Sequence, residues 1–561
     1  MLKNLDWIKT GLIGGMLICI MLLLREWEQF SAPPPLTENQ GSETEHLSAP
    51  PSAPPSAETP FTDPAIGLNP NTPANNASPL ATTNTSLENI IDVKTDVLNL
   101  KIDLSSGDFV QADLIEVHQK LDNDVPFRLL NKDAQHTYVA KSGLLVNGAS
   151  GYRPINPTFV SSKSNFELSA GQEELVVELT SQQDGFVLIK RLRFQRGEYL
   201  VGVEHEIQNT SATPWQGAFY AQIDRDDREP PTSSGFGMKP YVGAAITEPD
   251  DNYNKIDFGD LKDETYTSSA EKGWVALIQH YFVSAWIPVA DQSVSYKLGK
   301  YSNQNLYYHG FTQSTFSVLP GQSETIVAGF YVGPKDQYRL KEIAKHLDLT
   351  VDYSWLWWAA QPLFWLLQFI HSFVANWGVA IILLTCTVKL LFFPLSAASF
   401  RSMARMRKLT PKMQALKERH GDDRQALSQE MMKLYKKEQV NPMGGCLPIL
   451  IQMPIFLALY WVLLESVELR HAPFFGWIQD LSAKDPWFIL PVLMGLSMVV
   501  QQRLNPTPPD PMQAKVMQIM PIGFAIMMAW FPAGLVLYWT VNNLLSITQQ
   551  WVITRRIEAE N

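Results

Sequence analysis

Five apolar segments near the carboxyl end constrain the fold of this chain more than any other feature. They cover residues 376–398, 443–466, 487–500, 516–531 and 535–553. A helix needs about 20 apolar residues to cross the hydrocarbon layer of a membrane, and the third and fourth segments are short by that measure. Five such segments in succession predict a bundle of membrane-spanning helices.

The charges between these segments predict their orientation. The link at residues 399–442 carries 11 Lys+Arg against 5 Asp+Glu, the link at 501–515 carries Arg503 and Lys515, and the chain ends with Arg555 and Arg556. Basic links stay in the cytoplasm. We therefore expect both links and the carboxyl terminus in the cytoplasm, and residues 25–375 outside.

The amino-terminal part predicts an anchor and a linker. Lys3 and Lys9 precede an apolar run at residues 11–24, so we expect residues 1–30 to form an uncleaved transmembrane anchor, with a cleaved signal peptide as the alternative. Residues 31–87, with 12 prolines between 31 and 80, are too polar to form a core and predict a disordered linker. With the anchor, the chain would have six spans and both termini in the cytoplasm.

Residues 88–350 have the pattern of a large β-sandwich outside the membrane. Leu98, Leu100 and Ile102 alternate with polar residues, which is typical of a half-buried strand. A turn at 195–198 between two apolar runs predicts a hairpin. We also expect strands at 274–278, 282–287 and 325–332, and a short closing helix at 340–347.

The first 354 residues are acidic, with 27 Lys+Arg against 44 Asp+Glu, which argues against a nucleic-acid partner. Two acidic clusters could be paired carboxylates or calcium ligands, but they lack EF-hand spacing and are better explained as solvated loops. The clusters are Asp224, Asp226, Asp227 and Glu229, and Asp250 with Asp251.

Two helical elements are expected next to the bundle. Residues 351–375 include the aromatic run WLWWAAQPLFWLLQFIH, which predicts an amphipathic helix on the outer membrane surface, with a spanning helix as the alternative. Residues 399–440 predict a cytoplasmic helical hairpin, with helices at 400–419 and 424–438 and a turn and N-cap between them. A solvated basic loop is the alternative for the hairpin.

Lys389 lies close to the centre of the first segment if residues 377–399 form one continuous helix. A charge at that depth costs at least about 2.5–3.5 kcal/mol, so it is expected to face protein, water or a substrate path. Glu465, Glu468, Asp480 and Asp485 lie at the outer ends of later segments, too far away to pair with it. A structural, snorkelling lysine remains the alternative to a positive charge in a wet intramembrane cavity.

Other polar residues within the apolar segments point to the same cavity. Gln452 lies between two prolines of the second segment, and the last segment carries the helical stripe Tyr538, Asn542, Ser546 and Gln549. Fourteen of the 18 methionines follow residue 402, which suits a surface that accepts varied apolar partners. Packing between helices and core filling are the alternatives.

Catalytic and cofactor signatures are missing from the sequence. It contains no G-x-x-x-x-G-K-[ST], H-E-x-x-H or G-x-S-x-G motif. The three cysteines, Cys19, Cys386 and Cys446, all fall in apolar runs without metal-binding spacing. We therefore expect no enzyme activity, no cofactor and no metal site.

Three long runs resemble the YidC-type membrane protein insertases of Gram-negative bacteria. They are QEMMKLYKKEQVNPMGGCLPILIQMPIFLALYWVL, VELRHAPFFGWIQDLSAKDPWFILPVLMG and WFPAGLVLYWTVNNLLSITQQ. The resemblance is close over residues 376–556, which it identifies as a five-span insertase core. It implies a polytopic α-helical inner-membrane protein whose periplasmic domain is a twisted β-sandwich of the sugar-mutarotase type.

The resemblance also implies a function. Such a protein inserts small or polytopic membrane proteins without an energy source and helps them fold, alone or with the Sec translocon. A hydrophilic groove open to cytoplasm and lipid receives the outer segment of a nascent membrane protein, and the ribosome is a further candidate partner. The groove charge, usually arginine, is Lys389 here, and Trp539 stands where a second tyrosine is common.

The other positions carried over from the resemblance are of two kinds, substrate-contacting groove residues and basic residues of the cytoplasmic hairpin. The groove residues are Thr385, Gln452, Met453, Phe456, Tyr538, Trp539 and Asn542, and the hairpin residues are Arg401, Arg405, Arg407 and Lys408. Two competing functions are a channel or secondary transporter, and an anchored periplasmic sugar-binding or sugar-processing domain. The first would need inverted repeats or further intramembrane charges, and the second does not explain five further spans.

Overall fold

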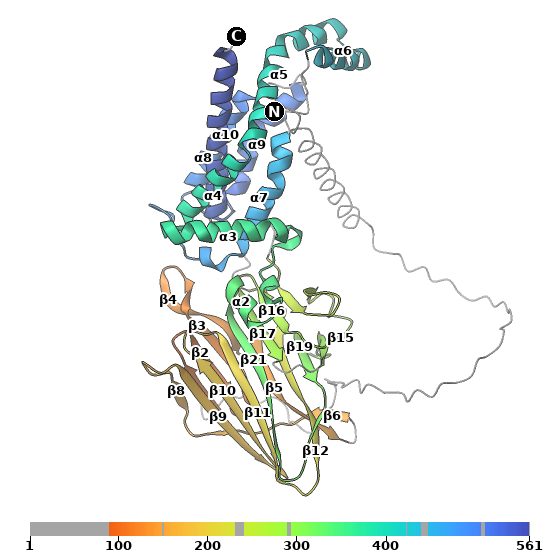
Figure 1. The fold of residues 1–561 in the computed structure, drawn as a ribbon, viewed down its shortest axis with the longest axis vertical. Helices are drawn as coiled ribbons and strands as arrows, with labels where there is room; N and C mark the ends of the chain where they lie inside the picture. The colour runs from red at the N-terminus through yellow and green to blue at the C-terminus, as the bar shows by residue number, and fades with distance from the viewer. Residues whose placement is uncertain are drawn as a thin grey trace, which may run out of the picture. The chain divides into compact units, whose positions relative to one another are not determined.

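The computed structural model describes residues 89–148, 151–230, 240–288, 293–421, 423–438, 447–505 and 511–559. The expected anchor and linker, Cys19 and Cys446 lie outside these residues. The described chain has a β-rich part followed by a helical part (Figure 1).

Twelve of the described strands form one sheet, in the order β15-β18-β19-β12-β5-β4-β3-β2-β1-β8, with β20 beside β12 and β6 beside β5. The pairing is antiparallel except between β1 and β8. The strands are β1 (Ile90–Lys94), β2 (Leu98–Asp103), β3 (Asp108–Lys120), β4 (Asn123–Lys132), β5 (Thr137–Gly148), β6 (Gly151–Pro154), β8 (Asn165–Glu167), β12 (Trp215–Asp226), β15 (Tyr266–Ala270), β18 (Val294–Lys300), β19 (Leu306–Gln313) and β20 (Phe316–Val318).

Nine described strands form a second sheet, in the order β14-β13-β16-β17-β21-β11-β10-β9-β7. They are β7 (Val160–Ser161), β9 (Glu174–Gln183), β10 (Phe186–Gln195), β11 (Leu200–Asn209), β13 (Gly243–Ile246), β14 (Asn254–Ile256), β16 (Val275–Gln279), β17 (Phe282–Pro288) and β21 (Ser323–Pro334). Figure 1 shows β9, β10, β11 and β21 side by side.

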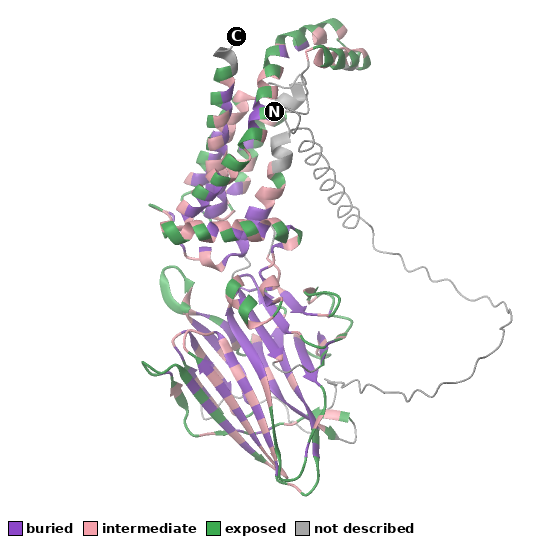
Figure 2. Ribbon diagram, in the orientation of Figure 1, coloured by how far each residue is buried: buried purple, intermediate pink, exposed green. Residues whose placement is uncertain are grey.

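The core of the β-rich part lies between the two sheets. Along β2, buried and half-buried residues alternate as its sequence pattern predicts, and Figure 2 shows this alternation on many strands. Phe109 of the first sheet stacks on Phe330 of the second, with ring centroids 5.1 Å apart, and Trp286 packs against both rings. The expected hairpin at 195–198 is confirmed, because β10 and β11 pair with Phe194 opposite Val201.

The helical part begins with α2, which starts earlier than the closing helix expected at 340–347 because Asp336 caps its first turn. The described elements are α2 (Gln337–Ile343), η3 (Leu347–Thr350), η4 (Ser354–Leu356), α3 (Trp357–Val374), α4 (Trp377–Leu391), α5 (Phe393–His420), α6 (Arg424–Lys437), α7 (Leu447–Glu465), η6 (Val467–Leu469), α8 (Ile489–Leu504), α9 (Pro511–Met528) and α10 (Ala533–Ala559).

The continuous helix expected at 377–399 is wrong. The chain breaks at Phe392 into α4 and α5, whose axes differ by 68°. Pro394 follows the break, and proline has no backbone N–H to donate to the carbonyl four residues earlier, so the hydrogen bonding of the α4 helix cannot continue through it. Among the described helices, none alone combines the length and hydropathy of a membrane span, whereas the bent pair of α4 and α5 does.

The expected helical hairpin is present in α5 and α6. Asp423 caps α6 by accepting the backbone N–H groups of Gln425 and Ala426. Leu409 and Met413 of α5 are buried with Met431 and Leu434 of α6 packed around them. None of the described residues of α6 is buried (Figure 2).

Candidate functional site

Lys389 lies in the last turn of α4 and contacts two other helices. Its ammonium nitrogen donates to Ser546 Oγ of α10 at 2.7 Å and to Gln452 Oε1 of α7 at 3.3 Å. Both acceptors are neutral. Three chain segments far apart in sequence therefore meet at one positive charge.

The acceptors of Lys389 are themselves held by α10. The Gln452 amide group donates to Asn542 Oδ1, and the Ser546 hydroxyl donates to the Asn542 carbonyl at 2.7 Å. Because the hydroxyl hydrogen of Ser546 points to its own helix backbone, an oxygen lone pair is left for the ammonium. The result is a connected polar cluster of Lys389, Gln452, Asn542 and Ser546, hereafter the polar clamp.

The polar clamp separates two cavities, and Gln452 lines both of them. The larger cavity, of about 290 Å³, is open and lies between α7, α8, α9 and α10. The smaller one has a volume of about 20 Å³ and is bordered by Lys389, Phe392 and Ser396, with room for about one water-sized group. Lys389 borders the small cavity and not the large one.

Most of the expected groove residues line the large cavity. Gln452, Met453, Phe456, Tyr538, Trp539 and Asn542 all do so. The ring of Trp539 contacts Phe456 edge to face, with centroids 4.3 Å apart, and also packs on Phe524. The cavity thus has an aromatic wall and amide groups, which suits a chain segment with both apolar and polar side chains.

Thr385 does not join the other expected groove residues. It is buried, its hydroxyl donates to the Ile381 carbonyl at 2.6 Å, and it borders neither cavity. Thr385 lies one turn before Lys389, and this spacing places both residues on one face of the helix. In the structure, the hydroxyl of Thr385 is satisfied by a backbone carbonyl of α4 and does not face either cavity.

Further cavity residues were not singled out from the sequence. They are Met498, Gln501, Gln502, Asn505, Met517, Met520, Pro521 and Asn543, whereas Ser546, which also lines the cavity, belongs to the polar stripe expected on the last segment. The excess of methionine after residue 402 is a general signal for three of them. The side of α8 and α9 that faces α10 could not be assigned without the packing.

The four basic hairpin residues Arg401, Arg405, Arg407 and Lys408 are exposed along α5. They do not border either of the two cavities. The structure therefore places them apart from the polar clamp, on a separate basic surface.

The acidic residues at the helix ends have partners other than Lys389. Glu465 pairs with Lys335 at 2.6 Å, with both side chains about 1% exposed. Asp485 is buried and accepts the backbone N–H of Leu490 at 2.7 Å, at the start of α8. Asp480 accepts from the backbone of His471 and Ser482.

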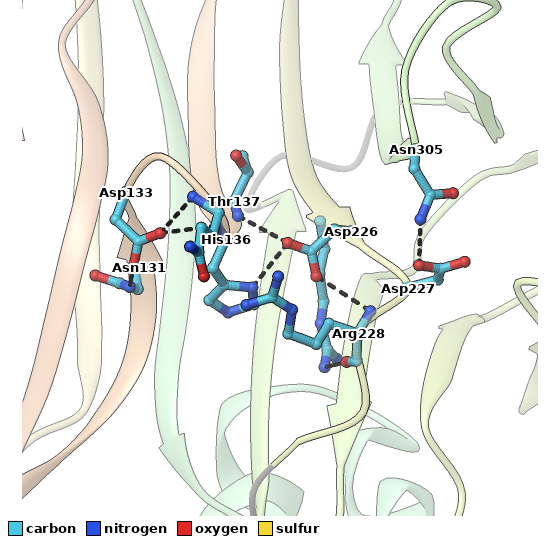
Figure 3. Close-up of polar contacts among 10 residues, drawn as sticks. Asn131, Asp133, His136, Thr137, Asp226, Asp227, Arg228 and Asn305 are labelled. Carbon is cyan, nitrogen blue, oxygen red and sulfur yellow. Dashed lines mark hydrogen bonds and ion pairs between the residues drawn. The ribbon is translucent and has the colours of Figure 1, made fainter.

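The acidic cluster near residue 225 is only partly a solvated loop, which corrects the expectation for Asp224. That residue lies in β12, is fully buried and pairs with Lys141 at 2.7 Å. Asp226 lies 2.8 Å from His136 Nδ1, and Asp227 accepts from Asn305 (Figure 3). Among the described residues, no group of three His, Cys, Asp or Glu side chains is placed to hold a metal ion.

Burial between the sheets perturbs several titratable groups. It lowers the pKa of Lys190 to about 8, an effect that the nearby Asp108 partly opposes. Burial likewise raises the pKa of the Asp108 carboxyl, against the attraction of Lys141 and Lys190. Lys190 donates to the Gly107 carbonyl at 2.7 Å and to Ser142 Oγ at 3.0 Å, so this cluster is satisfied within the core.

Comparison with known proteins decides the family. Residues 369–560 match the family described as 60Kd inner membrane protein, and residues 90–366 match the YidC periplasmic domain. A relative from Cellvibrio japonicus, named membrane protein insertase YidC, is 51% identical over 555 residues, 99% of each chain. The chain belongs to the YidC family of membrane protein insertases.

Other YidC proteins are similarly close. The YidC of Hahella chejuensis is 46% identical and covers 99% of this chain and 98% of its own. A solved structure of an active YidC insertase with its first transmembrane domain resolved is 18% identical, with a TM-score of 0.36, and covers 82% of this chain and 92% of that chain. The two family matches and the close relatives show that the chain is a YidC-type insertase of the inner membrane with a β-rich periplasmic domain.

Proposed function

We propose that this insertase receives the polar outer segment of a nascent membrane protein in the large cavity, with Lys389 as the attracting charge. The observation that carries the proposal is that the Lys389 ammonium is held by two neutral acceptors, Gln452 and Ser546, which themselves line the amide and aromatic cavity. No carboxylate among the described residues contacts this ammonium. An acidic substrate segment would supply the missing negative charge.

The energetics favour such a route without an external energy source. An apolar substrate span gains free energy on reaching lipid, so the protein has only to lower the barrier for moving a short polar segment. Exposed Met453 and the ring of Phe456 give apolar contact beside the amides of Gln452 and Asn542. Flexible methionine side chains suit partners of varied shape.

We propose a topology with the amino-terminal anchor and five core spans, both termini in the cytoplasm and the β-sandwich in the periplasm. The basic hairpin of α5 and α6 supports this arrangement, because Lys and Arg concentrate in cytoplasmic links. The exposed tryptophans Trp357, Trp358 and Trp365 on α3 suit a helix at the membrane surface.

We propose three further partner roles. The basic surface formed by Arg401, Arg405, Arg407 and Lys408 would meet incoming substrate or the ribosome. The Sec translocon would share larger substrates, and the protein would then act as a folding chaperone. The exposed position of the basic residues supports the first of these roles. No catalytic chemistry, cofactor or metal is part of the proposal.

Site-specific photocrosslinking to a stalled nascent single-span protein tests the substrate path. A photoreactive residue at Met453 or Trp539, which line the cavity, is expected to crosslink to the outer segment of the substrate. The matched control is Ile522, which is exposed on α9 and does not border the cavity. Equal crosslinking from Ile522 and Met453 to the outer segment would contradict the proposed path.

A further inference from the structure

Ser546 lines the large cavity and is also the member of the polar clamp that lies closest to Lys389. Ser546 Oγ is the closer of the two acceptors, at 2.7 Å against 3.3 Å for Gln452 Oε1. Hydrogen bonds from nitrogen to oxygen are usually 2.7–3.2 Å long, so the contact to Gln452 is at the weak end of the range. Ser546 is therefore the main anchor of the ammonium.

The local hydrogen bond of Ser546 determines that its hydroxyl acts toward other groups as an acceptor and not as a donor. Its hydroxyl donates to the Asn542 carbonyl one turn earlier in α10. A hydroxyl that already donates along its helix presents only lone pairs to other groups. It can accept from a cation but cannot compete with that cation for a substrate carboxylate.

The clamp also leaves part of the ammonium available. A lysine ammonium has three N–H donors, and Ser546 and Gln452 accept two of them. The third has no partner among the described residues. The cleft of about 20 Å³ beside Lys389 has room for a group the size of a carboxylate oxygen.

Without Ser546, the Lys389 ammonium would lose its position at the edge of the small cavity. Lysine has a flexible four-carbon stem and a strongly hydrated head group, so it reaches toward water when it is not held. Lys389 is followed by the break at Phe392 and by the exposed residues Leu390 and Leu391. The contact to Gln452 alone is a long one.

We propose that Ser546 is a positioning residue that holds the Lys389 ammonium at the groove and so determines the preference of this insertase for acidic outer segments. This inference rests on the proposed function, in which Lys389 attracts those segments. It assigns to α10 a part in substrate selection that acts through Lys389 and does not require contact with substrate.

The test uses the full-length protein in proteoliposomes and two single-span substrates whose outer segments differ only in Asp or Asn at two positions. The measured quantity is the ratio of protease-protected Asp substrate to Asn substrate. Ser546→Ala is expected to lower this ratio about fivefold, because one hydrogen bond to a charged group is lost. Ser546→Thr keeps the hydroxyl and is expected to keep the ratio.

Thr548→Ala is the matched control on the same helix. Thr548 also donates its hydroxyl to the carbonyl four residues earlier, at 2.9 Å from Leu544 O, but it is exposed and does not contact Lys389. Its substitution is expected to leave the ratio unchanged. Where Ser546→Ala reduces the amount of folded protein, Ser546→Cys serves as the second variant, since sulfur is a weak acceptor.

A Lys389→Met background separates the positioning role of Ser546 from the attraction of acidic segments by Lys389. If Ser546 acts through Lys389, adding Ser546→Ala to Lys389→Met changes the ratio no further. An equal effect of Ser546→Ala in both backgrounds, or an equal loss for both substrates, would overturn the positioning role. A ratio near one in the unmodified protein would instead overturn the proposed attraction by Lys389.

Discussion

The buried pair of Lys141 and Asp224 offers a quantitative test of the β-sandwich. The ammonium and carboxylate lie 2.7 Å apart, but their surroundings differ, because Asp224 is fully buried whereas the Lys141 side chain is about a third exposed. The gross attraction at an effective dielectric constant of 20 is about 6 kcal/mol, and desolvation of the carboxylate opposes it.

Two substitutions should therefore have unequal costs. Lys141→Met leaves a buried carboxylate without its cation, and we expect a loss of about 3 kcal/mol in the free energy of unfolding. The Tyr301 hydroxyl still donates to the carboxylate, at 3.2 Å, which keeps the loss at the lower end of the range. Asp224→Asn removes the charge, while Lys141 can turn to water, so about 1 kcal/mol is expected.

Urea unfolding of the full-length protein in detergent, followed by tryptophan fluorescence and by limited proteolysis, measures both values. In a thermal scan the larger loss corresponds to about 6–12 °C for a domain of this size. Lys94→Met is the control, because Lys94 and Glu167 form an exposed pair at 3.3 Å that should contribute less than about 1 kcal/mol. Equal costs for Lys141→Met and Lys94→Met would refute the reasoning.

Three further outcomes are expected. Lys389→Arg keeps the positive charge and should restore growth of an insertase-depleted strain, whereas failure to do so would show that the clamp accepts only an ammonium. Burial raises the pKa of Glu468 to about 7, because the folded state favours the neutral form of this carboxyl. The contribution of the neutral form to stability is therefore complete below about pH 4.5 and is lost as pH rises through 7. Glu468→Gln should therefore raise the melting temperature at pH 8, with no difference from the unmodified protein near pH 4.5. Asp485→Ala removes the acceptor for the Leu490 N–H and should cost about 1–2 kcal/mol, seen as faster proteolysis at the start of α8.

The sequence predicted correctly those elements that depend on residues close to one another in the chain. The alternation at Leu98, Leu100 and Ile102 became β2, and the turn at 195–198 became the β10–β11 hairpin. Asp423 caps α6 as its position before the helix predicts. These features depend on side chains within a few residues of one another, so the sequence alone contains the physical information.

Contacts between distant segments could not be predicted in the same way. The stripe that includes Ser546 was visible, but its contact with Lys389 depends on how α4 and α10 pack. Pro394 indicates a helix break near Phe392, but the continuous apolar run around Pro394 favoured a single helix. Asp224 resembled a loop residue because acidic neighbours follow it, whereas strand pairing with β5 buries it opposite Val139.

The central claim is that the sign of the charge at position 389 determines whether the protein prefers substrates with acidic or basic outer segments. The most direct measurement is insertion into proteoliposomes of matched substrates with acidic or basic outer segments, by the unmodified protein and by Lys389→Glu. We expect the unmodified protein to favour the acidic segment and Lys389→Glu to favour the basic one. Undiminished insertion of the acidic substrate by Lys389→Glu would contradict the claim.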